Sequence, residues 1–139
     1  MTKVADIMTR SIATVQREET IQTAAKRMRE MDVGSLPVLD GQAVVGMVTD
    51  RDIAVRGVAD GMVAQESRVA DVMTAEVRCC RADDSIEEVM DQMGEAQVRR
   101  LPVLDANNEV VGVVTLGDLA TRQSADTDET LREISTPGR

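Results

Sequence analysis

Two matched threonine–aspartate pairs are the residues with the clearest chemical potential. Thr49 and Asp52 lie three residues apart after an apolar Gly-x-Val-Thr run, and Thr115 and Asp118 repeat the arrangement. This spacing is typical of a capping box, in which threonine starts a helix and the carboxylate returns the hydrogen bond. The same geometry suits a nucleotide, because the hydroxyl and the free N–H groups of a helix start face a phosphate, while the carboxylate can accept from both ribose hydroxyls. Both interpretations stay open at this point.

The composition restricts the chemistry further. The 139 residues include no histidine and no aromatic side chain, and the formal net charge is −9. Without histidine there is no default general base near neutral pH and no imidazole metal ligand, so we predict no catalytic residue and no metal site. The acidic charge and the lack of a stacking platform disfavour nucleic acid. With no apolar run long enough to cross a bilayer and no signal peptide, the sequence predicts a cytoplasmic, non-enzymatic protein without a membrane role.

The motifs recur because the chain is a tandem duplication. Residues 4–9 align with residues 69–74, 36–40 with 101–105, and 44–49 with 110–115. We therefore expect one repeat at residues 2–57, a linker at 58–68 and a second repeat at 69–123. A polar tail at 124–139 should hold a weak helix and a frayed end.

Each copy predicts the element order β-α-β-β-α. The expected elements are short strands at 12–15 and 77–80, amphipathic helices beginning at Ile21 and Ile86, hairpins, and final helices starting near the two threonines. Pro37 and Pro102 lack an N–H group, so the first hairpin strand should have a free edge there. We expect Thr2 and Ser67 to cap a short leading helix in each copy. Because one copy alone buries too little surface, the two should pack about a pseudo-twofold axis.

Together, the two β-α-β-β-α repeats, the Leu-Pro-Val-Leu-Asp hairpins and the paired Gly-x-Val-Thr-x-x-Asp motifs resemble a tandem pair of CBS domains (a Bateman module). The resemblance covers residues 2–123 and is closest to small stand-alone CBS-pair proteins of bacteria. It implies an α/β fold with two clefts between the repeats that bind AMP, ADP, ATP, NAD or S-adenosylmethionine. It also implies a homodimer that acts as a non-catalytic sensor and signals through conformational change or through a protein partner that the sequence does not identify.

Transferred position by position, the resemblance implies that Thr49 and Thr115 contact phosphate and that Asp52 and Asp118 hold the ribose. Residues of the first strand and those leading into each proline would flank the adenine: Ile12, Ala13, Ser35, Leu36 and Pro37 in the first copy, and Val77, Arg78, Arg100, Leu101 and Pro102 in the second.

Positive charge differs between the two clefts. The first motif carries Arg51 between threonine and aspartate. The second has Gly117 there and carries Arg99 and Arg100 before its hairpin instead. We therefore expect the two clefts to bind ligand with unequal affinity.

Two other functions remain possible from the sequence. The threonine–aspartate pairs could be only helix caps in a structural or protein-interaction module. Alternatively, the adjacent Cys79 and Cys80 could form a thiol-based redox sensor. A disulfide between neighbours is strained, and two thiols without histidine make a poor zinc site, so we expect one buried and one exposed strand residue here.

Overall fold

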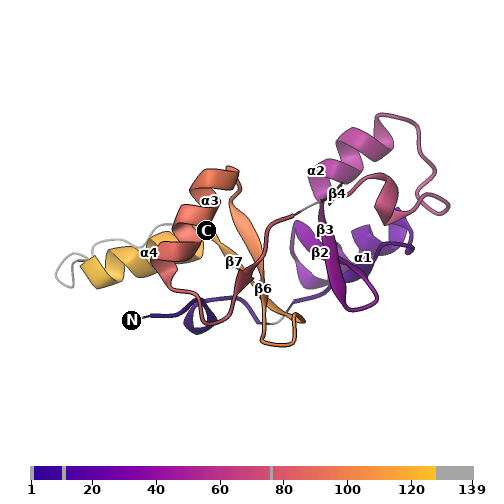
Figure 1. Ribbon diagram of the computed structural model, residues 1–139. Coiled ribbons are helices and arrows are strands. Elements are labelled where there is room, and N and C mark those ends of the chain that lie inside the picture. Colours follow the sequence, from indigo (N-terminus) through magenta and orange to yellow (C-terminus); the bar gives the residue numbers. More distant parts are fainter. Residues whose placement is uncertain (1, 11, 76, 128–139) are drawn as a thin grey trace. The chain divides into compact units, whose positions relative to one another are not determined.

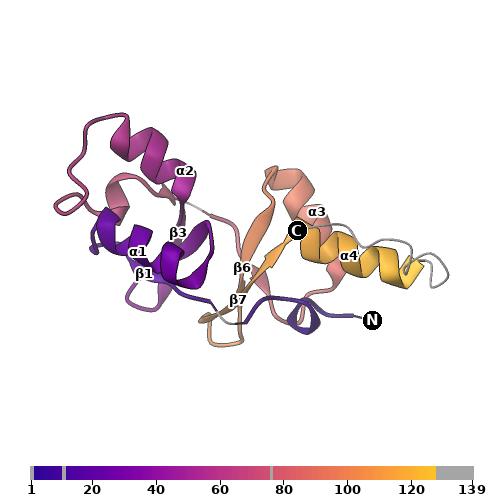
Figure 2. The same ribbon diagram turned by 180° about the vertical axis from the view of Figure 1, so that it is seen from behind.

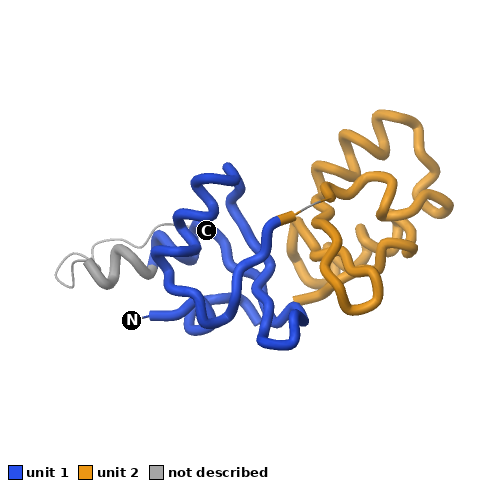
Figure 3. The backbone as a smooth tube through the Cα atoms, in the orientation of Figure 1, with its two compact units in different colours: residues 1–11, 78–139 blue, residues 12–77 orange. Residues whose placement is uncertain are grey.

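The computed structural model describes residues 2–10, 12–75 and 77–127, with side chains described as far as residue 121. The chain divides into two compact units, one of residues 12–77 and one of residues 1–11 with 78–139 (Figure 3). We call them the 12–77 unit and the 78–139 unit. Each combines a small sheet with helices, which confirms the predicted α/β class.

The 12–77 unit contains a four-stranded sheet in the order β1-β2-β3-β4 (Figure 1). Its elements are β1 (Val15–Gln16), α1 (Ile21–Met31), β2 (Ser35–Asp40), β3 (Ala43–Thr49), α2 (Asp50–Asp52), the π-helix η2 (Ile53–Val58), the 3-10 helix η3 (Val69–Asp71) and β4 (Thr74–Ala75). β1 pairs parallel with β2, and the other neighbours are antiparallel. Apolar residues of α1 pack with the sheet, where Leu36, Val38 and Val48 are fully buried.

The 78–139 unit repeats this plan with a three-stranded sheet, β5-β6-β7. Its elements are the 3-10 helix η1 (Val4–Asp6), β5 (Cys80–Arg81), α3 (Ile86–Ala96), β6 (Arg100–Leu104), β7 (Val110–Thr115) and α4 (Leu116–Thr127). α3 and α4 lie beside each other in both views (Figures 1 and 2). Thr9 bridges to Val113 of β7 and so takes the place that β4 has in the other unit.

The leading segment of each sequence repeat packs in the compact unit that holds most of the other repeat. Val4 belongs to the core of the 78–139 unit, and its N–H donates to the carbonyl of Asp84. Val69 belongs to the core of the 12–77 unit, and its N–H donates to the carbonyl of Glu19. The compact units and the sequence repeats are therefore different divisions of the chain, and the repeat boundaries stay a prediction.

The first strand of each unit starts later than expected. β1 begins at Val15 and β5 at Cys80, so the prediction of strands at 12–15 and 77–80 is wrong. The register explains the shift, because Val15 pairs with Val38 and Cys80 with Val103, directly after the two prolines. A proline cannot donate to the ladder, so pairing begins only beyond it.

The predicted caps of the leading helices are also wrong. Lys3 and Arg68 occupy the cap positions rather than Thr2 and Ser67. The backbone N–H groups of Lys3 and Arg68 each donate to a carboxylate three residues later, at 3.0 Å. Because an aspartate supplies this bond, the turn needs no hydroxyl at its first position.

The expected linker forms hydrogen bonds with a helix, and the expected tail begins within one. Within residues 58–68, the carbonyls of Ala64 and Ser67 accept from the first two N–H groups of α1, at Gln22 and Ile21. At the other end, α4 runs to Thr127, and residues 128–139 of the predicted tail lie outside the described residues. In the part of the chain that the structure describes, no helix is long and apolar enough to cross a membrane.

The leading segments that pair with β3 and β7, at Thr74 and Thr9, require the glycine of each Gly-x-Val-Thr run. A Cβ on Gly46 would lie 2.5 Å from the carbonyl oxygen of Thr74, and a Cβ on Gly112 would lie 2.8 Å from that of Thr9. Backbone carbonyls held in a sheet cannot move away cheaply. These glycines thus let the leading segment pair with the strand that ends in the threonine.

We predict that Gly46→Ala lowers the free energy of unfolding by about 1–3 kcal/mol, because the new methyl group overpacks a backbone contact. Gly94→Ala is the matched control, since a Cβ at that position would meet nothing within 4 Å and the residue occupies a helix interior. That control should raise the free energy of unfolding by about 0.5–1 kcal/mol. Urea titrations of both variants measure the difference. Equal effects would contradict the explanation that the close approach of the Thr74 backbone requires glycine at position 46.

Candidate functional site

The first candidate site lies where β3 ends and α2 begins. We call Thr49, Asp52 and Ser35 the Thr49 corner. The N–H of Asp52 donates to Thr49 Oγ1 at 2.9 Å, and the N–H of Thr49 donates to Asp52 Oδ2 at 3.1 Å. Ser35 opens β2 directly opposite Thr49 in the antiparallel register.

The second candidate site has the same construction at the end of β7. We call Thr115, Asp118 and Arg100 the Thr115 corner. The N–H of Asp118 donates to Thr115 Oγ1, and the N–H of Thr115 donates to Asp118 Oδ2, both at 3.1 Å. Arg100 opens β6 opposite Thr115, and Asp118 is only 6% exposed. The capping interpretation of both motifs is therefore confirmed.

A capping role leaves these groups able to bind a ligand. In the cap each hydroxyl acts as an acceptor, so its own hydrogen can still be donated to a phosphate or hydroxyl oxygen. Asp52 uses Oδ2 for the cap, while its Oδ1 lies 3.8 Å from a guanidinium nitrogen of Arg56. The cap fixes the direction of both side chains before any ligand arrives.

The residues that lead into each proline were predicted to flank the adenine. The strand register places them beside the end of the strand that carries the motif threonine. Paired residues of neighbouring strands project from the same face of a sheet, and the next pair projects from the opposite face. Leu36 pairs with Val48 and Leu101 with Val114, and all four are fully buried. The threonines and their partners therefore project away from these core pairs.

This alternation limits which predicted residues can offer side chains. Leu36 and Leu101 commit their side chains to the core, so only their backbone groups could meet a ligand. Pro37 and Pro102 are buried as well. Ser35 is half-buried and Arg100 is exposed.

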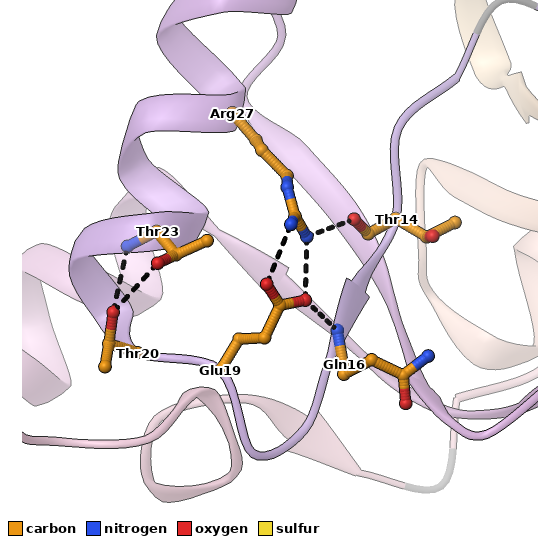
Figure 4. Close-up of polar contacts among 6 residues, drawn as sticks. All are labelled: Thr14, Gln16, Glu19, Thr20, Thr23 and Arg27. Carbon is orange, nitrogen blue, oxygen red and sulfur yellow. Dashed lines mark hydrogen bonds and ion pairs between the residues drawn. The ribbon is translucent and has the colours of Figure 1, made fainter.

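The predicted adenine-flanking residues of the first copy precede β1 and are held by a charged clamp. Ile12 and Ala13 are half-buried, and Ala13 packs against the core of the 12–77 unit. Next to them, Arg27 of α1 donates to the carbonyl of Thr14 at 2.9 Å and pairs with Glu19 at 2.7 Å (Figure 4). The hydrogen bond from Arg27 lowers the pKa of Glu19 against the opposing effect of burial.

The second copy lacks this clamp. Gln92 and Asp84 stand at the aligned positions, so no guanidinium–carboxylate pair can form there. Val77 is half-buried and is the last residue of the 12–77 unit. Arg78 is exposed and pairs with Glu95 at 3.5 Å, an ion pair in high-dielectric surroundings that adds little stability.

Arg56 is a residue near the site that was not predicted from the sequence. Its guanidinium donates to the carbonyls of Val72 and Met73, each at 3.1 Å, and lies beside Asp52. It thus joins the Thr49 corner to the segment leading into β4. The spacing of four residues from Asp52, repeated by Asp118 and Arg122, is the sequence signal that could have found it. Arg51, which was predicted to contribute, is exposed on α2.

The cysteines have the properties of packing residues. Cys80 is 2% exposed, and burial, with smaller contributions from Asp84 and Cys79, raises its pKa to about 12. Burial also raises the pKa of Cys79. Thiolates are the reactive form of cysteine, so both side chains are poor nucleophiles at neutral pH.

Two further features of the described residues lie away from the corners. An open hollow of about 500 Å³ is lined by residues 81–83 and 104–106, at the far end of β6 from Arg100. Two of its polar lining residues already stabilise the hairpin, since Arg81 donates to the carbonyl of Asp105 at 2.9 Å. Among residues 2–10, 12–75 and 77–127, no three histidine, cysteine or carboxylate side chains gather as a metal site would require.

Solved structures of similar fold include two that hold adenosine compounds. The CBS domain pair of protein MJ0100, in complex with 5′-methylthioadenosine and S-adenosyl-L-methionine, is 26% identical with a TM-score of 0.76, covering 92% of this chain and 99% of that one. CBSX2 of Arabidopsis thaliana, in complex with AMP, is 25% identical with a TM-score of 0.73, covering 92% of this chain and 100% of that one.

Among curated relatives, the CBS domain-containing protein YhcV of Bacillus subtilis is 43% identical, over 91% of this chain and 89% of its own. Hypoxic response protein 1 of Mycobacterium tuberculosis is 38% identical, over 86% of this chain and 84% of its own. Its crystal structure with two coordinated zinc ions has a TM-score of 0.77, covering 86% of this chain and 97% of that one. The family model of the CBS domain matches residues 4–57 and again residues 69–125. With both capped corners inside these matched segments, the chain belongs to the CBS-domain family and carries two such domains in tandem.

Proposed function

We propose that this protein is a non-catalytic regulatory module that binds adenosine-containing ligands at the Thr49 and Thr115 corners. The observation that carries the proposal is the repeated pairing of a hydroxyl and a carboxylate at equivalent strand–helix junctions. Two CBS pairs of similar fold hold AMP, or 5′-methylthioadenosine and S-adenosylmethionine, which supports this class of ligand. ADP, ATP and NAD share the adenosine part and remain candidates.

Each corner offers the groups that an adenosine compound needs. The threonine hydroxyl can donate to a phosphate or to the 5′ oxygen, and the aspartate can accept from the two ribose hydroxyls. In the 12–77 unit, Ala13 and the backbone around Leu36 would flank the base. An adenine between aliphatic groups and backbone amides needs no aromatic side chain, consistent with a chain that has none.

The regulatory part of the proposal requires two states of the molecule. A ligand changes an equilibrium only if it binds one state more tightly than the other. Arg56 links the ligand site to the rest of the 12–77 unit, because it contacts both Asp52 and the segment leading into β4. We propose that the signal is read by a protein partner and that the module works as a homodimer.

Zinc is not part of the proposal, although one relative binds it. The chain has no histidine. Its only cysteines are adjacent, and burial raises the pKa of both, which opposes the deprotonation that a thiolate ligand needs. The donor set therefore does not fit a structural zinc site.

We predict that Asp52→Asn and Asp118→Asn each weaken ligand binding at their own corner by about 1.5–3 kcal/mol, because a charged acceptor of the ribose is lost. Calorimetry with AMP, ADP, ATP, NAD and S-adenosylmethionine measures this effect. A ligand at 100 times its dissociation constant should also stabilise the folded protein by about 2.7 kcal/mol in thermal-shift assays.

Glu88→Gln is the matched control for these variants. Glu88 forms the same capping box with Ser85, at 3.1 and 3.2 Å, on a helix outside the two corners. It should cost folding stability comparable to the aspartate variants and leave ligand binding unchanged. If no compound of the panel binds the wild-type protein, the motifs are only caps and the structural-module interpretation is correct.

The thiol-sensor alternative makes a different prediction. With a pKa near 12, Cys80 should react with iodoacetamide at pH 7–8 far more slowly in the folded protein than in urea, since almost none of it is thiolate. Its reaction rate should rise with pH up to about pH 12 rather than level off near pH 9. Mass spectrometry of timed samples measures the labelling rate and its dependence on pH. Rapid labelling of Cys80 in the folded protein at pH 7 would support the thiol-sensor alternative.

A further inference from the structure

The two corners share the same strand–helix geometry and differ in the charged residues around it. In each, a residue that opens a strand faces the motif threonine, with a capping aspartate one turn further on. Four aligned positions around this framework carry different residues: Gly34, Ser35, Asp50 and Arg51 at one corner, and Arg99, Arg100, Leu116 and Gly117 at the other. At these four positions, the Thr49 corner thus has one carboxylate and one guanidinium, whereas the Thr115 corner has two guanidinium groups and no carboxylate.

At the Thr49 corner, a carboxylate lies against the start of β2. The N–H of Asp50 donates to the carbonyl of Gly34 at 3.0 Å, which ties the two segments together. A Cβ on Gly34 would lie only 3.2 Å from Asp50 Oδ2. The other oxygen, Oδ1, accepts from the N–H of Arg51 at 2.8 Å, so the carboxylate is held in this place. An incoming phosphate would meet this negative charge next to Gly34, the residue before Ser35.

At the Thr115 corner, the same positions present only positive charge. Arg100 faces Thr115 across the strand pair and is exposed, and no ion pair of its guanidinium is found within the described part of the chain. Leu116 replaces the carboxylate, and its N–H donates to the carbonyl of Arg99 at 2.7 Å. A guanidinium beside a hydroxyl is a favourable arrangement for phosphate, because it can form charge-assisted, bidentate hydrogen bonds.

We propose that the two corners divide adenosine ligands by the charge of the group at the 5′ position. The Thr115 corner binds phosphorylated adenosine compounds, for which Arg100 determines specificity. The Thr49 corner binds adenosine compounds whose 5′ group is neutral or cationic, because Asp50 repels phosphate and attracts a sulfonium or ammonium group. This division rests on the proposed function, since it names which ligand each corner takes.

The test compares AMP with 5′-methylthioadenosine by calorimetry on the full chain. Asp52→Asn weakens the Thr49 corner so that the Thr115 corner dominates binding, and in that background Arg100→Ser should weaken AMP about tenfold while changing 5′-methylthioadenosine less than about twofold. Asp118→Asn weakens the Thr115 corner so that the Thr49 corner dominates, and there the pair Ser35→Arg with Asp50→Leu should strengthen AMP about tenfold. These substitutions exchange aligned residues of the two corners, so the Thr49 corner acquires the two positive charges of the Thr115 corner, and the Thr115 corner loses one of its two.

Arg29→Ser controls for net charge, because Arg29 is exposed in the last turn of α1 and its loss changes the total charge equally. It should leave the AMP affinity within about twofold, since screening weakens distant surface charges. A measurement on the wild-type protein avoids any folding defect of the variants. Added potassium chloride should weaken AMP binding much more than 5′-methylthioadenosine binding.

The possible failures are distinguishable. If neither compound binds the wild-type protein, the division by charge is wrong, and the proposed function is wrong as well once ADP, ATP, NAD and S-adenosylmethionine also fail to bind. If both compounds bind but Arg100→Ser changes them equally, or salt weakens them equally, the proposed function stands and the division by charge is wrong. The division by charge is also wrong if the exchanged Thr49 corner shows no gain in AMP affinity.

Discussion

Each corner is built on two reciprocal hydrogen bonds, in which a threonine hydroxyl and an aspartate carboxylate satisfy each other's backbone N–H groups. These bonds stabilise a helix start whose N–H groups would otherwise lack partners. They also restrict both side chains to one orientation. A ligand that contacts such groups loses less free energy to side-chain ordering, because the fold has already ordered them. At the proposed sites, the requirements of folding and of binding would therefore be met by the same atoms.

The corners depend in turn on the exchange of leading segments between the repeats. β3 and β7, which lead into the capped threonines, are each paired along both edges. β2 and β6 supply one edge, and Thr74 and Thr9 supply the other across Gly46 and Gly112. In each case that outer segment belongs to the other sequence repeat. This exchange also explains why a chain with such small repeats forms adequate cores, since Val4 and Val69 each complete the core of the unit that holds most of the other repeat.

The sequence predicted those features whose cause is local. The capping boxes at the two motif threonines, the hairpins and the amphipathic helices follow from residue spacing and lie where the pattern indicated, whereas the caps of the two leading helices were misplaced. The start of β1 was misplaced because it depends on a long-range pairing with β2, in which Pro37 decides where the ladder begins. Arg56 was missed for a related reason, since its partners at Val72 and Met73 are carbonyls that no side-chain pattern can reveal. The fit of a ligand at each corner depends on such backbone groups too, so the sequence supports it only through resemblance.

In a duplicated chain, some aligned positions are restricted to the same residue in both copies, whereas others are free to differ. Gly46, Thr49 and Asp52 recur as Gly112, Thr115 and Asp118 because a change at any of them disturbs a strand crossing or a cap. Positions beside the motif whose side chains take part in neither contact are half-buried or exposed, and they are where the copies differ, as at Ser35 and Arg100. Electrostatic differences can therefore accumulate around a fixed framework without loss of stability. Under the proposed function, a duplication of this kind keeps the geometry that would hold an adenosine and leaves free the charges that would distinguish one adenosine compound from another.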